Sequence, residues 1–157
     1  MVSLRIDMRI QISLFVLVAA VFCGCAGDHF KTGRGDVGPF ILQQAVARGG
    51  SPDTNSLPPI SGAWRYSEDK YGVVIRMSPE QFPAVEAFLH NAFGEPKINP
   101  AETPEGFKLG VYRLSSKGGA IQFSCDTNQT QIIVLRPMST EEIFHGVSET
   151  LKDGSAK

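Results

Sequence analysis

The sequence predicts an α+β fold: an antiparallel sheet of about five strands with two helices on one face, in the order ββαβββα. Three observations support this prediction. Five short segments alternate apolar and polar residues, which is the pattern of half-buried strands. Two longer segments carry helix-start signals and an apolar stripe. The turns between the last three strands are short, and short turns join antiparallel neighbours.

The strands are expected at 63–66, 71–77, 107–114, 120–125 and 131–136. In the second strand Val73, Ile75 and Met77 share one face, because successive side chains of a strand point to opposite sides. Turns near Gly118 and Asp126 separate the last three strands. These three strands are therefore expected to form a meander within one sheet.

The two helices are expected at 78–93 and 139–151. In the first, Ser78 and Gln81 have the spacing of a capping box, although Pro83 favours a separate first turn and a helix proper that begins at that proline. In the second, Ser139 and Glu142 have the same spacing. An apolar stripe follows each signal, so both helices are expected to pack on the sheet.

The residues before the first predicted strand divide into two parts. Residues 1–24 have the layout of a secretory signal, with basic residues followed by an unbroken run of nine apolar residues, 14–22. This run is shorter than the roughly 20 apolar residues of a membrane-spanning helix. Between 27 and 62, 11 of 36 residues are Gly or Pro, which predicts a tether over 25–60 with a short helix at 40–48. A single domain is then expected at 61–152, with a disordered tail at 153–157.

The end of the signal, Val21-Phe22-Cys23-Gly24-Cys25, resembles the lipobox of bacterial lipoproteins. The resemblance implies that the Cys25 thiol carries a diacylglyceryl group, that the chain is cut before Cys25, and that the new amino terminus takes a fatty acyl group such as palmitate. Two or three acyl chains hold a protein firmly on a bilayer. The implied location is the cell envelope, at the outer membrane facing the periplasm if the cell has two membranes. Ordinary cleavage after Ala26 is the alternative, and it would give a secreted or periplasmic soluble protein.

Few residues have the spacing of a chemical site. His29, His90 and His145 are not spaced as metal ligands, and no Cys-x-x-Cys pair occurs. Cys125 lies on the apolar side of a predicted strand, where it is expected to be a small buried residue. With 15 Lys and Arg against 16 Asp and Glu, the net charge of -1 gives no electrostatic footprint for nucleic acid. The sequence therefore favours a binding or structural protein over an enzyme, with no catalytic residue, metal ion or cofactor predicted.

Two classes of function remain open. The first is a lipid-anchored structural or protein-interaction module that meets another protein of the envelope through a sheet face or edge. The second is a carrier for a small apolar ligand. For the carrier, Gly62-Ala63-Trp64 resembles the G-x-W motif of lipocalins, which implies a tryptophan at the base of a ligand-holding barrel, although a lipocalin needs eight strands. Six aromatic residues would line the carrier's pocket: Trp64, Phe82, Phe88, Phe107, Phe123 and Phe144.

Overall fold

The computed structural model describes residues 29–103, 106–116, 119–139 and 141–142 of the 157-residue chain. Its centre is one antiparallel sheet with the strand order β1-β2-β3-β6-β5-β4. The strands are β1 (Lys31–Asp36), β2 (Ser61–Glu68), β3 (Gly72–Met77), β4 (Lys108–Arg113), β5 (Ala120–Cys125) and β6 (Thr130–Leu135). The helices are α2 (Gly38–Ala47) and α3 (Phe82–Phe93), with 3₁₀ turns η1 (Pro79–Gln81) and η2 (Pro100–Glu102). The α+β fold is confirmed, with six strands in place of about five.

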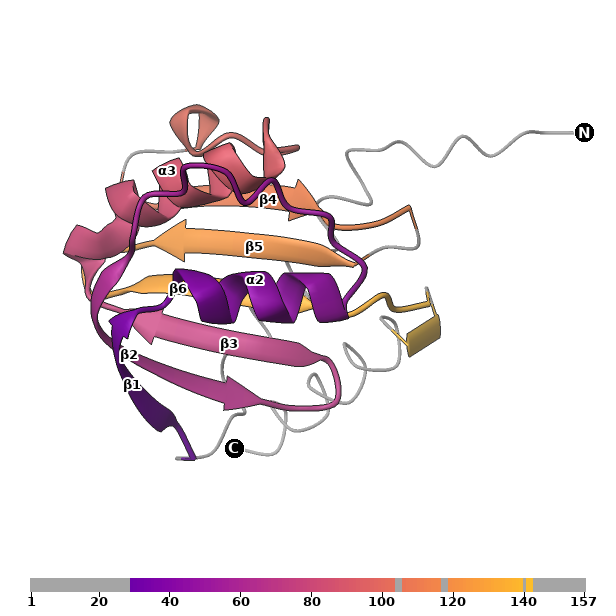
Figure 1. Cartoon of the computed structure of the whole chain (residues 1–157), viewed down its shortest axis with the longest axis horizontal. Coiled ribbons are helices and arrows are strands. Elements are labelled where there is room, and N and C mark those ends of the chain that lie inside the picture. Colours follow the sequence, from indigo (N-terminus) through magenta and orange to yellow (C-terminus); the bar gives the residue numbers. More distant parts are fainter. Residues whose placement is uncertain (1–28, 104–105, 117–118, 140, 143–157) are drawn as a thin grey trace, which may run out of the picture. The chain divides into compact units, whose positions relative to one another are not determined.

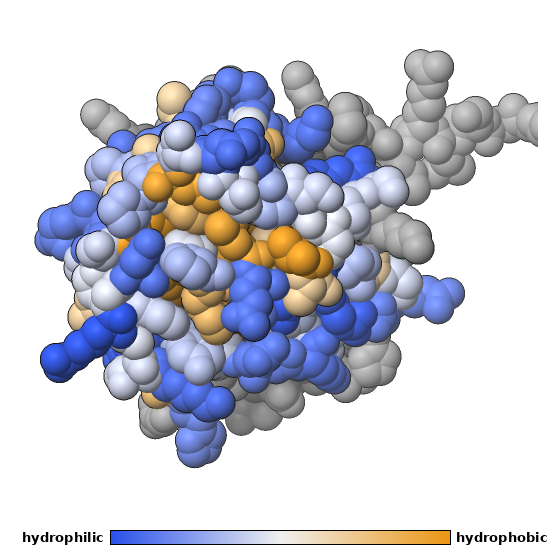
Figure 2. Space-filling model, viewed as in Figure 1, coloured by the Kyte–Doolittle hydropathy of each residue, from blue (hydrophilic) through white to orange (hydrophobic). Residues whose placement is uncertain are grey.

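Helices α2 and α3 cover the same face of the sheet (Figure 1). The core forms where their apolar side chains meet the inward side chains of the strands. The largest fully buried side chains belong to Phe123, Ile41, Ile60, Ile75, Leu89, Ile121, Ile132, Val37, Val73, Val85 and Val134. Figure 2 shows that the apolar side chains left at the surface of this view gather in the middle, ringed by hydrophilic ones. Burying one side chain of this size contributes about 1.5–3 kcal/mol to the free energy of unfolding. The cover that α2 and α3 provide is therefore a main source of the domain's stability.

Strand β1 and helix α2 lie within the segment predicted to be a tether, so that prediction is wrong for the residues described here. β1 forms six residue pairs with β2 and is one edge of the sheet. On α2, Ile41 and Ala45 are 0% exposed and belong to the core. The short helix expected at 40–48 is confirmed at Gly38–Ala47. The domain therefore begins near Lys31, about thirty residues before the predicted boundary.

Two side chains explain how a Gly-rich segment forms this edge strand. Gly33 pairs with Trp64, and the indole ring of Trp64 lies so close that a Cβ at Gly33 would collide with it. At the end of β1, the Asp36 Oδ1 atom accepts hydrogen bonds of 2.9 Å from the backbone N–H groups of Gly38 and Ile60. The carboxylate thus joins the end of β1, the start of α2 and the entry to β2.

The start of α3 differs from the prediction. Ser78 makes no side-chain capping bond, and the backbone N–H of Gln81 instead donates to the Ser78 carbonyl at 3.1 Å. The capping box predicted there is wrong. The predicted separate first turn is η1, and α3 begins at Phe82 with Pro83 in its first turn, where a missing N–H costs no helical bond.

The capping box predicted at Ser139 is confirmed. The backbone N–H of Ser139 donates to the Glu142 carboxylate at 2.9 Å, and the backbone N–H of Glu142 donates to the Ser139 hydroxyl at 3.2 Å. The remainder of the predicted helix, including Phe144, lies outside the described residues, as do the predicted signal, Cys25 and the predicted tail.

The opposite face of the sheet has two halves of different character. On β5 and β6, Ile133 and Leu135 are buried beside the polar side chains of Gln122, Ser124 and Gln131. On β1 and β2, the side chains at the same face are exposed and include Arg34 and Arg65. Positive charge is therefore concentrated on the β1 side of this face.

Candidate functional site

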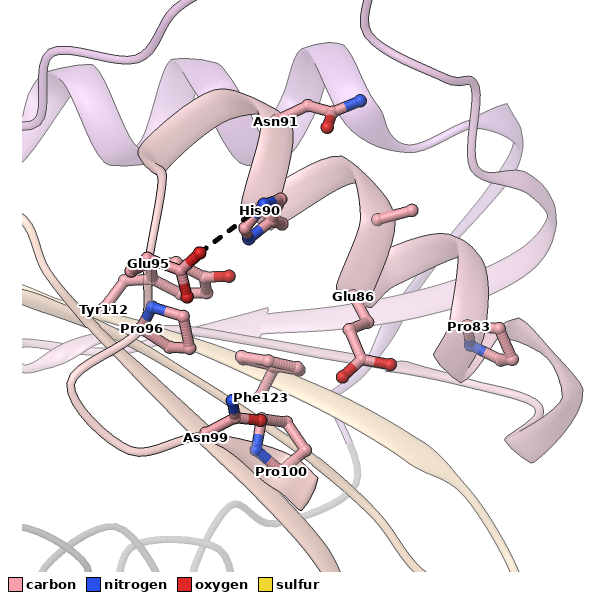
Figure 3. Close-up of a pocket in the computed structure, with 11 residues that line it drawn as sticks. Pro83, Glu86, His90, Asn91, Glu95, Pro96, Asn99, Pro100, Tyr112 and Phe123 are labelled. Atoms are coloured by element: carbon pink, nitrogen blue, oxygen red, sulfur yellow. Dashed lines mark ion pairs between the residues drawn. The ribbon is translucent and has the colours of Figure 1, made fainter. Parts of the chain in front are cut away.

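A first surface hollow, of about 400 Å³, lies between α3 and the loop that follows it. Figure 3 shows Glu86 pointing from α3 toward Phe123, while His90 of the same helix lies beside Glu95. His90 Nε2 and Glu95 Oε1 are 3.9 Å apart, with their side chains 52% and 82% exposed. An ion pair so open to water contributes little to stability. The hollow is lined by Pro83, Glu86, Ala87, His90, Asn91, Glu95, Pro96, Asn99, Pro100, Tyr112 and Phe123.

Tyr112 is the titratable group most altered by this environment. Its side chain is buried, and burial raises the pKa of Tyr112 to about 12, with further contributions from the negative charges of Glu86 and Glu95. At neutral pH the phenol therefore keeps its proton. Tyr112 can donate a hydrogen bond into this hollow, but it cannot act there as a base or as a phenolate nucleophile. The two glutamates place negative charge on the wall of this hollow.

The raised pKa of Tyr112 makes the stability depend on pH in alkali. The pKa in the folded state lies above the ordinary value of 10.0, so the stabilisation is complete below pH 10 and is lost as the pH rises toward 12. We expect the urea midpoint of the wild type to fall more steeply over this window than that of Tyr112→Phe, which has no proton to release. Urea unfolding at several pH values between 8 and 12 measures the difference. Parallel pH profiles for the two proteins would show that Tyr112 titrates alike in the folded and unfolded states.

A second hollow, of about 450 Å³, lies on the opposite face of the sheet, and we call it the arginine hollow. Arg34, Arg65 and Arg76 contribute to it from β1, β2 and β3, and Arg65 is the direct cross-strand partner of Arg76. The ring of Phe30 lies 4.6 Å from the Arg76 guanidinium carbon and 5.8 Å from that of Arg65. The described lining residues are Thr32, Gly33, Arg34, Ala63, Trp64, Arg65, Arg76, Met77, Ser78, Asn128 and Gln129. None of these carries a carboxylate.

Sequence reasoning missed the arginine hollow. Arg34 lies in the segment interpreted as a tether, and Arg65 and Arg76 lie in different predicted strands. Only the register of β1, β2 and β3 brings the three side chains together. The one signal available in the sequence is that Arg65 and Arg76 alternate with the apolar positions of their strands, which places both on the face away from the core.

The aromatic residues predicted to line a carrier pocket do not form one among the residues described. Phe82, Phe88 and Phe123 are at most 3% exposed and belong to the filled core, where the rings of Phe82 and Phe123 stack with centroids 5.6 Å apart. Trp64 packs separately against Phe40 and Tyr66. Phe107 is 44% exposed, and Phe144 lies outside the described residues. The sheet is also open, with β1 and β4 at its edges, so the likeness of Gly62-Ala63-Trp64 to the lipocalin motif does not extend to the fold.

Cys125 lies on the core side of β5, as predicted, and is a free thiol, but it is partly rather than fully buried. Its Sγ atom lies 3.3 Å from the carbonyl oxygen of Asp126, to which it donates. Within the described ranges, no three His, Cys, Asp or Glu side chains are grouped so that they could hold a metal ion. The helices described are all too short or too polar to cross a bilayer.

The sequence and the structure were compared with those of known proteins. No known protein family, no curated protein and no solved structure matches the chain. Conclusions about function therefore rest on the residues themselves.

Proposed function

We propose that the chain is a lipid-anchored protein of the bacterial cell envelope whose domain is an interaction module working at the membrane surface. Two features of the chain support this proposal. The residues up to Cys25 resemble a lipoprotein signal, and the domain presents two charged hollows on its surface. Hollows with charged and polar walls suit polar partners rather than a buried apolar ligand.

The short connection between Cys25 and the domain is the observation that carries the proposal. β1 begins at Lys31, six residues after Cys25. Six extended residues span at most about 20 Å, which is less than the 40–45 Å thickness of a bilayer with its head groups. A lipid on Cys25 would therefore keep the β1 edge of the sheet close to the membrane, whereas the tether predicted from composition would have let the domain range far from it.

The contents of the core weigh against the apolar-ligand carrier. Phe82, Phe88 and Phe123 would have to face a ligand, but they pack against each other and against neighbouring core residues. Opening a ligand cavity there would require the loss of these contacts. Two hollows on the described part of the surface are rimmed instead by charged side chains, glutamates in one and arginines in the other.

Replacing Cys25 by Ser tests the anchor, because serine cannot form the thioether. In cells supplied with an alkyne-bearing palmitate, we expect the wild type to be labelled and to reach its mature size. Cys25→Ser is expected to lose the label and to accumulate as the uncut precursor. Membrane fractionation is a second measurement, in which only labelled protein should withstand extraction by alkali.

Cys23→Ser is the matched control, because Cys23 lies two residues earlier and would leave with the signal. It should be labelled and cut like the wild type. Label remaining on Cys25→Ser, or lost from Cys23→Ser, would show that Cys25 is not the lipidated residue.

A further inference from the structure

We propose that the arginine hollow binds a phosphate group, and that the phosphate belongs to the head group of an anionic lipid. The first part rests on the geometry of the hollow alone. The second part, the lipid source, rests on the proposed membrane anchor. Inorganic phosphate is the other source with the same chemistry, and the experiment below separates the two.

The lining of the hollow has the composition of an anion site. Arg34 and Arg65 are exposed on neighbouring strands and both line the hollow. A guanidinium group presents its N–H donors in a planar fork that fits two phosphate oxygens at once. The neutral donors of Thr32 and Asn128 also line the hollow. A phosphate would thus meet both positive charge and hydrogen-bond donors, with no carboxylate among the described lining residues to repel it.

The arrangement of Arg65 and Arg76 also favours an anion. The two are direct partners across β2 and β3, and like charges opposite one another in a sheet are destabilising. The ring of Phe30 lies within 5.8 Å of both guanidinium groups, and these cation–π contacts offset part of this repulsion. An anion bound beside Arg65 and Arg76 would attract both guanidinium groups.

Arg76 is held in position by its surroundings. Its Nε atom donates to the Gln131 Oε1 atom of the next strand at 3.2 Å. Gln131 is buried, so this contact fixes the guanidinium group against the floor of the sheet face. Arg76 then serves as the fixed side of the hollow, while Arg34 and Arg65 form its exposed rim. A site with one fixed cation and two exposed ones needs little reorganisation to bind.

The position of the hollow along the chain points to a lipid as the source of the phosphate. Phe30 and Thr32, next to the hollow, are only five and seven residues from Cys25. A domain held so close to a bilayer is exposed to lipid head groups at high local concentration. The volume of about 450 Å³ lies within the range of ligand sites, 300–1,000 Å³, and exceeds what a phosphate alone would fill.

The fluorescence of Trp64, the only tryptophan of the chain, offers an indirect measurement. Its neighbours Ala63 and Arg65 on β2 line the hollow, while its indole packs on the other face of the strand against Phe40 and Tyr66. The protein is purified from its own cells in a mild neutral detergent and titrated with phosphatidylglycerol, phosphatidylcholine or inorganic phosphate. We expect a saturable change in emission with phosphatidylglycerol and a much smaller one with phosphatidylcholine. The affinity should fall as salt is added, as it does for charge-driven binding.

Arg65→Gln and Arg34→Gln test the residues of the rim. Each is expected to weaken phosphatidylglycerol binding by about tenfold or more, the loss expected when a charge-assisted hydrogen bond is removed. Arg113→Gln is the matched control, since Arg113 is an exposed arginine on the same face, at the opposite edge of the sheet. An unchanged urea midpoint in each variant shows that the fold is intact. If one rim variant fails to fold, the other still tests whether the rim arginines bind the lipid.

Each outcome decides the proposal. Saturable binding that Arg65→Gln or Arg34→Gln weakens and Arg113→Gln does not supports the site. Equal effects of the rim variants and the control would overturn it, because the attraction would then be diffuse, and so would no saturable change with either anionic probe. Saturation by inorganic phosphate at similar concentration would keep the phosphate site and reject the lipid source. The titration does not require a lipid on Cys25. The binding result can therefore be interpreted even if the Cys25→Ser experiment shows that the chain is not lipidated.

Discussion

Replacing Ile41 by Ala is expected to lower the free energy of unfolding by about 2–5 kcal/mol, the range for truncating a buried isoleucine. Ile41 lies on α2, is 0% exposed and belongs to the core. A domain of this size has only about 5–15 kcal/mol of stability in total, so the loss is a large part of it. Urea unfolding followed by the fluorescence of Trp64 measures the change. The expected loss follows directly from placing α2 inside the domain rather than in a tether.

Val46→Ala is the control on the same helix, because Val46 is 56% exposed and its truncation leaves no cavity. We expect its free energy of unfolding to stay within about 0.5 kcal/mol of that of the wild type. Equal midpoints for Ile41→Ala and the wild type would mean that α2 does not support the core.

Replacing Phe123 by Ala is expected to lower the free energy of unfolding by about 3–5 kcal/mol, a large part of the total of about 5–15 kcal/mol. The ring of Phe123 is 0% exposed and lies between two other rings, with its centroid 5.6 Å from that of Phe82 and 5.7 Å from that of Tyr112. Its removal would leave a cavity between Phe82 and Tyr112 and would take away both stacking contacts. The loss of near-ultraviolet circular dichroism on heating reports the shift in midpoint.

Phe107→Ala serves as the control for Phe123→Ala, since Phe107 is the same residue type but 44% exposed. Its unfolding midpoint should change little. A carrier with an apolar pocket at Phe123 would behave differently, because truncation there would enlarge an existing space and cost far less.

The strands with regular alternation could be predicted from the sequence. In β3 and β5 the side chains on one face are apolar, and the predicted bounds differ from those observed by at most one residue. The turn at Asp126 is also explained locally, because its carboxylate accepts from the backbone N–H groups of Asn128 and Gln129. The alternation of apolar and polar residues is enough to predict a strand that has an apolar face of its own.

β1 could not be predicted, because its stability comes from a partner distant in the chain. Its residues include two glycines and three charged side chains, and it has no apolar face of its own. Pairing with β2 and the cover of Trp64 over Gly33 supply what the strand lacks. The same error concealed the arginine hollow, since Arg34 reaches the other arginines only through this pairing.

The place of β3 in the sheet affects how the protein is made. β3 pairs on one side with β2, which precedes it directly, and on the other with β6, so that the partners Arg76 and Gln131 lie 55 positions apart in the chain. Pairings between such distant residues form slowly, because a long loop must close first. A growing chain that ended before β6 could not complete the middle of this sheet. For a chain exported as proposed above, that delay would keep the chain unfolded during its passage across the membrane and would postpone folding until β6 arrives.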